Sequence, residues 1–130
     1  MTARHRIEEL TNAWYGYCTL SAIAALFRDG IPGPFAIVWA ALGLGCTLIG
    51  VWFVGRRLLA RSSLTRFVLL LVTGIGMVFG AWQTGRMALS FVRSWELGVL
   101  AAAVFLGVSA YMHAKSFRTL LDRDVRSYFR

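Results

Sequence analysis

The chain carries three long apolar runs, and short polar segments rich in arginine separate them. The runs are Phe35–Gly55, Phe67–Gly85 and Leu97–Ala114. A helix rises 1.5 Å per residue, so about 20 apolar residues cross the ~30 Å of hydrocarbon in a bilayer. These runs lack the regular polar face of an element in a soluble protein. The pattern therefore predicts three membrane-spanning helices.

The segment before these runs has a more ambiguous pattern. Ala13–Phe27 is an apolar run of only 15 residues, and it begins with aromatic side chains typical of a membrane interface. By length it predicts a short span, an interfacial helix or a re-entrant helix. Extension back through Thr11 and Asn12 makes it long enough for a fourth span. The stiff sequence Ile31-Pro32-Gly33-Pro34 separates it from the next run.

Basic residues are distributed as expected for four spans with both chain ends in the cytoplasm. This topology places 11 basic residues inside and 3 outside, in agreement with the positive-inside rule. If the first helix only lies on the membrane surface, the bias falls to 9 against 5. The inside set is Arg4, Arg6, Arg56, Arg57, Arg61, Arg66, Lys115, Arg118, Arg123, Arg126 and Arg130, and the outside set is Arg28, Arg86 and Arg93.

We therefore predict an all-α fold, an integral membrane four-helix bundle with four transmembrane helices, N-in and C-in. The spans are expected at roughly 11–28, 35–55, 67–86 and 97–114, with a cytoplasmic tail at 115–130. Apolar residues make up 58% of the 130 positions, and neither the loop nor the tail can bury a core of its own. The chain is expected to be a single transmembrane domain.

Short amphipathic helices are predicted at both ends. In the tail, an apolar stripe runs beside a ladder of alternating charge, and the start carries two oppositely charged pairs at helical spacing. The stripe is Phe117, Leu120, Leu121, Val125 and Tyr128; the ladder is Arg118, Asp122 and Arg126; the pairs are Arg4–Glu8 and His5–Glu9. Arg93 and Glu96 are expected to form a surface ion pair.

The net charge is +8, and 13 of the 14 basic residues are arginine. Because these residues flank the apolar runs, they indicate topology and contact with anionic lipid headgroups, and no nucleic-acid partner is expected. The guanidinium fork suits phosphate. The candidate lipid phosphate contacts are Arg56, Arg57, Arg61 and Arg66.

Each long run also has a stripe of small residues at helical spacing. Such stripes let helix backbones approach closely in lipid, either within one chain or between subunits. The stripes are Ala36, Ala40, Gly43, Thr47 and Gly50; Thr73, Gly76, Gly80, Thr84 and Met87; and Ala103, Gly107, Ala110 and Ala114. The glycines predicted to serve helix packing are Gly43, Gly50, Gly76, Gly80 and Gly107.

Few polar side chains fall inside the runs. Gln83, Thr84 and Arg86 are the candidate pore-mouth or headgroup contacts near the outer end of the third span. His113 is expected to be solvated at the inner interface. No mid-span carboxylate, catalytic triad or metal-ligand spacing is present, and Cys18 and Cys46 are expected to be buried free thiols. We therefore expect no enzyme activity, catalytic residues, cofactor or metal.

The layout resembles the GtrA-type flippase family for polyprenyl-linked sugars. The resemblance rests on four spans and on Gly55-Arg56-Arg57 followed by Leu64-Thr65-Arg66-Phe67, where that family has its basic loop. The family's asparagine before the arginine pair is Gly55 here, an aromatic after it is Leu58, and the glycine-rich opening is missing. The resemblance implies a carrier of lipid-linked substrates.

The sequence favours a small non-enzymatic membrane protein that acts by assembly, as an accessory or structural subunit of a larger membrane complex. Its expected partners are the bilayer with its anionic headgroups and other membrane subunits or copies of itself. The alternative is a homo-oligomeric channel or small transporter, including a lipid-linked substrate flippase. The arginine-rich, alanine- and glycine-rich composition favours a bacterial inner membrane, with an organelle membrane as the alternative.

Overall fold

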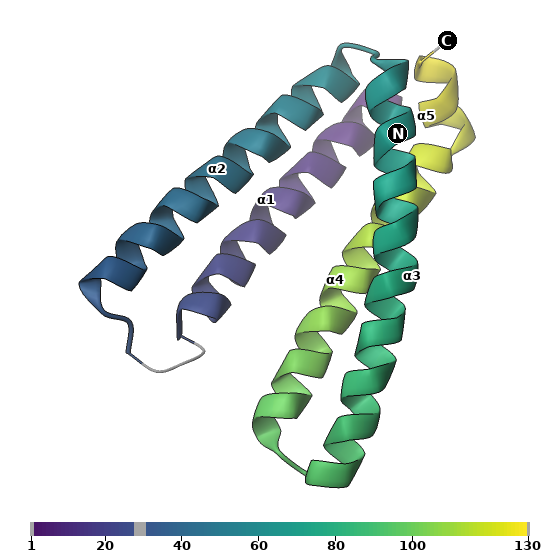
Figure 1. Cartoon of the computed structure of the whole chain (residues 1–130). Helices are drawn as coiled ribbons and strands as arrows, with labels where there is room; N and C mark the ends of the chain where they lie inside the picture. The colour runs from purple at the N-terminus through teal and green to yellow at the C-terminus, as the bar shows by residue number, and fades with distance from the viewer. Residues whose placement is uncertain (1, 28–30, 130) are drawn as a thin grey trace. The chain divides into compact units, whose positions relative to one another are not determined.

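The computed structural model describes residues 2–27 and 31–129 as helices joined by short turns (Figure 1). The five helices of these residues are α1 (Ala3–Phe27), α2 (Pro34–Leu59), α3 (Ser63–Ser94), α4 (Leu97–Leu121) and α5 (Arg123–Tyr128). Three of them, α2, α3 and α4, are long and apolar enough to cross a membrane. The all-α prediction is confirmed, and these three helices indicate a membrane protein.

The chain divides into two compact units. One contains α1 packed against α2, and the other contains α3 packed against α4, with α5 following α4. Within each unit the two long helices run antiparallel (Figure 1). The described residues thus form two helical hairpins, each with its own seam.

The helices are longer than the apolar runs that predicted them. The span predicted at 67–86 belongs to a helix of 32 residues, α3, and the helix predicted at 97–114 continues to Leu121. The predicted amphipathic start and the first apolar run form one continuous helix, α1, whose Arg4 and Glu8 make the predicted ion pair at 2.9 Å. Bilayer thickness limits the apolar run, whereas local backbone chemistry decides where a helix ends.

The ends of α2 show this chemistry. Gly33, in an extended conformation with φ −71° and ψ 162°, precedes Pro34, whose fixed φ suits the first helical position. At the other end, Arg61 adopts a left-handed φ of 60°. Its N–H donates to the carbonyl of Leu58, and the N–H of Ser62 donates to that of Arg57. This is a Schellman motif, which satisfies carbonyls left open by the last turn.

The turn from α3 to α4 separates two residues that were predicted to pair. Trp95 has a left-handed φ of 54° and ends α3, and Glu96 caps the start of α4. Arg93 and Glu96 therefore lie on opposite sides of a helix break, and they form no ion pair in the part of the chain that the structure describes. The prediction was wrong because i,i+3 proximity requires a continuous helix.

The predicted charge ladder in the tail is also interrupted. Asp122 lies between α4 and α5, and its Oδ1 accepts a hydrogen bond of 3.0 Å from the N–H of Asp124. This is an N-cap on the short helix α5. Arg118 and Arg126 consequently belong to different helices.

Glycines bring α3 and α4 into close contact. A Cβ added at Gly80 would lie 3.1 Å from the Cβ of Ala110, and one at Gly76 would lie 2.7 Å from Nε2 of His113. The imidazole of His113 therefore occupies the space that the missing side chain of Gly76 leaves. Its Nδ1 lies 2.8 Å from the carbonyl of Ser109. His113 is a half-buried residue of this seam, so one edge of the ring that was expected to be solvated packs against Gly76.

Arg66 links the beginning of α3 to the end of α4. Its Nε donates a hydrogen bond of 3.0 Å to the carbonyl of Leu120, in the last turn of α4. A cation is favourable there, because the C-terminal carbonyls carry the negative end of the helix dipole.

Candidate functional site

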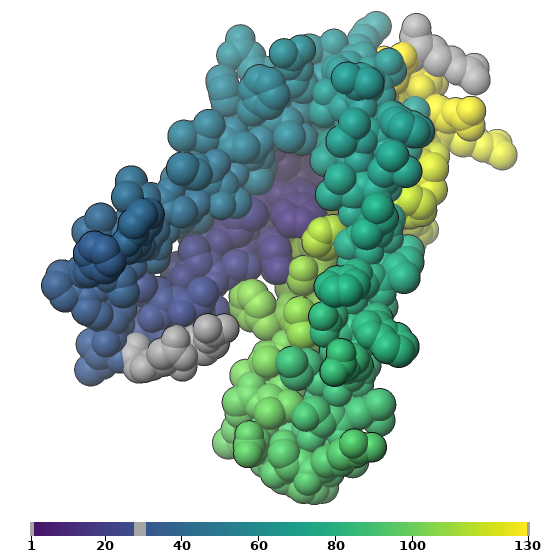
Figure 2. All heavy atoms as spheres, in the orientation of Figure 1, coloured from purple at the N-terminus to yellow at the C-terminus, as the bar shows by residue number. Residues whose placement is uncertain are grey.

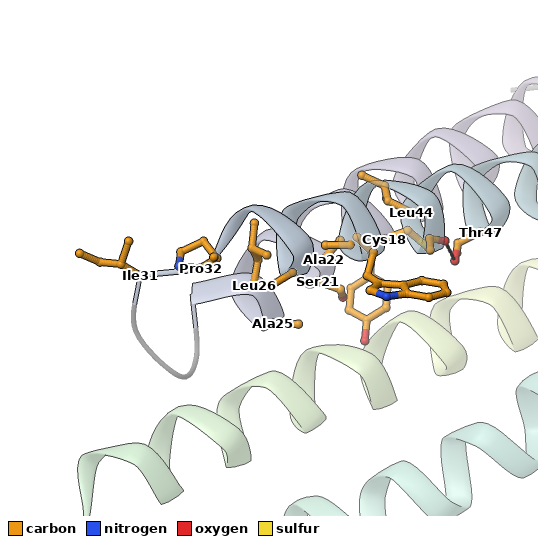
Figure 3. A pocket seen from close by; sticks show the side chains of 15 residues that line it. Cys18, Ser21, Ala22, Ala25, Leu26, Ile31, Pro32, Leu44 and Thr47 are labelled. Atoms are coloured by element: carbon orange, nitrogen blue, oxygen red, sulfur yellow. Dashed lines mark hydrogen bonds between the residues drawn. The ribbon is translucent and has the colours of Figure 1, made fainter.

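A groove of about 780 Å³ lies between α1 and α2. Figure 3 shows Cys18, Ser21, Ala22 and Leu26 of α1 along the groove, together with Leu44 and Thr47 of α2. The other lining residues are Tyr17, Ala25, Ile31, Pro32, Gly33, Ala36, Trp39, Ala40 and Gly43. The walls are mostly apolar and small, as in a seat for a hydrophobic chain or helix.

The small-residue stripe predicted on α2 supplies one wall of this groove. Ala36, Ala40, Gly43 and Thr47 all line it. A Cβ added at Gly43 or at Gly50 would meet no atom within 4 Å among the described residues. On α2 the stripe therefore makes room, whereas on α3 the stripe makes contact with α4.

The seam between α1 and α2 uses a different face of α2. A Cβ added at Gly55 would lie 2.8 Å from Cγ2 of Thr11, so the two helices approach closely at that point. Gly55 follows Gly43 by 12 positions, which turns it roughly 120° around the helix. The predicted stripe thus flanks this seam and borders the groove. Sequence reasoning missed Gly55 because it assigned the glycine only to the end of a span.

One hydroxyl in the groove wall lacks a partner. Ser21 Oγ is buried and makes no hydrogen bond within the described residues. Other hydroxyls on these helices donate to the carbonyl four residues earlier, as Thr47 does to Gly43 at 2.8 Å and Thr19 does to Tyr15 at 2.9 Å. Ser21 retains an unused donor in the groove wall.

Two of the candidate phosphate contacts stack on aromatic rings one turn earlier in α2. The guanidinium carbon of Arg56 lies 5.3 Å from the ring centroid of Trp52. That of Arg57 lies 5.1 Å from the ring of Phe53. Such cation–π pairs hold a charge at a membrane interface, where an aromatic ring is also favourable. The third candidate, Arg61, lies in the turn after α2.

The three candidates on α3 do not form one cluster. Thr84 belongs to the seam with α4, since a Cβ at Gly107 would lie 3.6 Å from its Cγ2, and its Oγ1 donates to the carbonyl of Gly80 at 2.8 Å. Arg86 is exposed and Gln83 is half-buried. Two positions along a helix turn a side chain by roughly 160°, so Thr84 and Arg86 point to different sides. Only Gln83 and Arg86 share a face.

The described residues show no group of three His, Cys, Asp or Glu side chains that could hold a metal ion. Cys18 and Cys46 are both free thiols, and Cys46 is exposed on α2 rather than buried within its unit. Arg28 and Arg130, two residues of the topology count, lie outside the described residues.

The contact between His113 and Gly76 was also missed. The spacing could have predicted this contact. His113 follows Ala110 by three positions and therefore lies on the same face of α4 as the small-residue stripe.

Comparison of the chain with protein-family models, curated proteins and solved structures gives no match.

Proposed function

We propose that this protein is a non-enzymatic membrane subunit that acts by assembly, and that the α1–α2 groove receives a transmembrane helix of a larger partner subunit. The observation that carries the proposal is the small-residue stripe of α2, which lines a groove that its own unit leaves open. Backbones approach closely in lipid only where side chains are small. A helix that enters this groove gains that contact with α2.

The exposed surface of α2 supports the same proposal. Figure 2 shows that α1 leaves a long side of α2 uncovered. Large apolar side chains of α2 are exposed, among them Trp39 in the groove wall, which is 61% exposed.

The proposal includes a topology of four spans, with both chain ends on the cytoplasmic side of a bacterial inner membrane. α1 is a single helix of 25 residues, which corresponds to about 37 Å. This length suffices for a crossing although its first turns are charged. The excess of arginine on the proposed inner side, together with Arg56 and Arg57 above their aromatic rings, supports this orientation.

The groove is tested by filling it. Gly43→Leu places a large side chain in the groove, and Gly45→Leu is its matched control on α2. A Cβ at either glycine meets nothing within 4 Å, but only Gly43 lines the groove. The two positions point roughly 160° apart.

Native mass spectrometry of protein extracted gently from its own membrane is the measurement. We expect wild type and Gly45→Leu to carry a larger partner at a fixed ratio, and Gly43→Leu to lose it. A monomer in every sample, or equal retention by both variants, would contradict the proposal. A closed ring of identical copies would support the second candidate instead.

That second candidate is a homo-oligomeric channel or small transporter, with a flippase of lipid-linked substrates as one form. Gln83 and Arg86 favour it, because they place two polar side chains on one face of α3. Conductance of reconstituted protein tests it, and Arg86→Glu should change ion selectivity. Arg93→Glu makes the same change of charge in the last turn of α3 and serves as the control. Equal shifts in both variants would count against a pore mouth at Arg86.

A further inference from the structure

A second recess, of about 420 Å³, lies at the end of the α1–α2 unit where α1 begins and α2 ends. We call it the arginine notch, and it shares no residue with the larger groove. α1 contributes Glu8, Thr11, Asn12 and Tyr15, and α2 contributes Trp52, Gly55, Arg56 and Leu59. The contact of Thr11 with Gly55 holds the two walls together.

The notch combines one cation with neutral donors and an apolar edge. Arg56 is exposed and stacks on Trp52, and it forms no ion pair within the described residues. Asn12 offers amide donors and Tyr15 a hydroxyl. Glu8 is the one carboxylate in the lining, and its Oε1 accepts from Nε of Arg4 at 2.9 Å, so its charge is compensated by a residue outside the notch.

We propose that the arginine notch binds the phosphate of an anionic phospholipid. A guanidinium presents paired N–H donors that match phosphate oxygens. Trp52 and Leu59 offer apolar surface for the part of the lipid next to its headgroup. The notch lies where an apolar helix ends in arginines and aromatic rings, which is the level of the headgroups in a membrane.

Arg57 provides a matched control. It is the next residue along α2, it is exposed, and it stacks on Phe53 as Arg56 does on Trp52, but it does not line the notch. Arg56→Gln and Arg57→Gln each remove one positive charge. General attraction to an anionic surface therefore weakens equally in both variants, whereas binding in the notch is lost only with Arg56.

The test uses Trp52 as the reporter, in a chain whose other four tryptophans (Trp14, Trp39, Trp82 and Trp95) are replaced by phenylalanine. Quenching of its fluorescence is measured in vesicles with brominated phosphatidylglycerol or brominated phosphatidylcholine at equal mole fraction. We expect about fivefold preference for the anionic lipid, retained in Arg57→Gln and abolished in Arg56→Gln. Circular dichroism checks that each variant is helical.

The remaining arms decide the source of the phosphate. Inorganic phosphate at millimolar concentration should not reduce the preference; if it does, the notch binds soluble phosphate and the lipid assignment is overturned. Equal loss in both arginine variants, or no preference in wild type, would also overturn it. Asn12→Leu, which keeps every charge, is the second variant if Arg56→Gln does not fold, and it should lower the preference about twofold.

Discussion

The two hairpins use small residues in opposite ways. In the α3–α4 hairpin, glycines lie against side chains of the facing helix, with Gly80 beside Ala110 and Gly76 beside His113. In the α1–α2 hairpin, Gly43 and Gly50 face open space, and among the described glycines of this hairpin only Gly55 makes a close contact. A stripe of small residues therefore predicts where another helix can approach, without specifying which helix does so.

The residues that face the small-residue stripes differ between the two hairpins. The imidazole of His113 fills the space that Gly76 leaves beside its backbone. Opposite Gly80 is Ala110, which is small enough to let the backbones of α3 and α4 approach closely. The wall of α1 opposite the stripe of α2 offers Ser21, Ala22 and Ala25, which are all small. Side chains of α4 thus lie beside Gly76 and Gly80, whereas no atom of the described residues lies within 4 Å of a Cβ added at Gly43 or Gly50.

The largest effect is expected at Gly76. Gly76→Leu should destabilise the α3–α4 hairpin by about 2–3 kcal/mol, because the new side chain would overlap the imidazole of His113. The unfolding free energy in mixed detergent and dodecyl sulfate is the measurement. Gly85→Leu is the control on the same helix, since a Cβ at Gly85 meets nothing within 4 Å. Equal losses of unfolding free energy at both positions would show that overlap with His113 is not the cause of the destabilisation.

A smaller effect is expected at Gly55. Gly55→Ala should lower the unfolding free energy of the α1–α2 unit by about 1 kcal/mol, because its Cβ would lie 2.8 Å from Cγ2 of Thr11. Thr11→Ser in the same chain removes that methyl group and should recover most of the loss. A double-mutant cycle measures this coupling. If the two changes are additive, the close approach at Gly55 does not hold the seam.

The sequence predicted the helices, but it did not predict which helices pack against each other. Apolar length predicted α2, α3 and α4, because a span must satisfy its own backbone hydrogen bonds and cover about 30 Å. Apolar length did not predict where the helices end. Trp95 and Arg61 adopt left-handed φ without being glycine, and no composition signal marks them.

The candidate site was predictable only in part. Helical spacing predicted that Ala36, Ala40 and Gly43 share a face, and they do line one groove. That the groove stays open depends on how α1 packs against α2, with the close approach at Gly55, and spacing along one helix does not predict this packing. Spacing alone should have separated Thr84 from Arg86, since residues two apart do not share a helix face.

The smallest effect is expected at Gly43, where two measurements should move in opposite directions. Gly43→Ala should raise the unfolding free energy of the isolated protein by about 0.5 kcal/mol, since alanine favours helix and its Cβ meets nothing within 4 Å. The same substitution should weaken capture of the partner subunit, because the added methyl group narrows the groove. Gly45→Ala should give the gain in stability without the loss of partner. If Gly43→Ala raises stability and leaves assembly intact, the partner helix does not pack closely against Gly43. The small-residue stripe of α2 would then have a role other than helix packing.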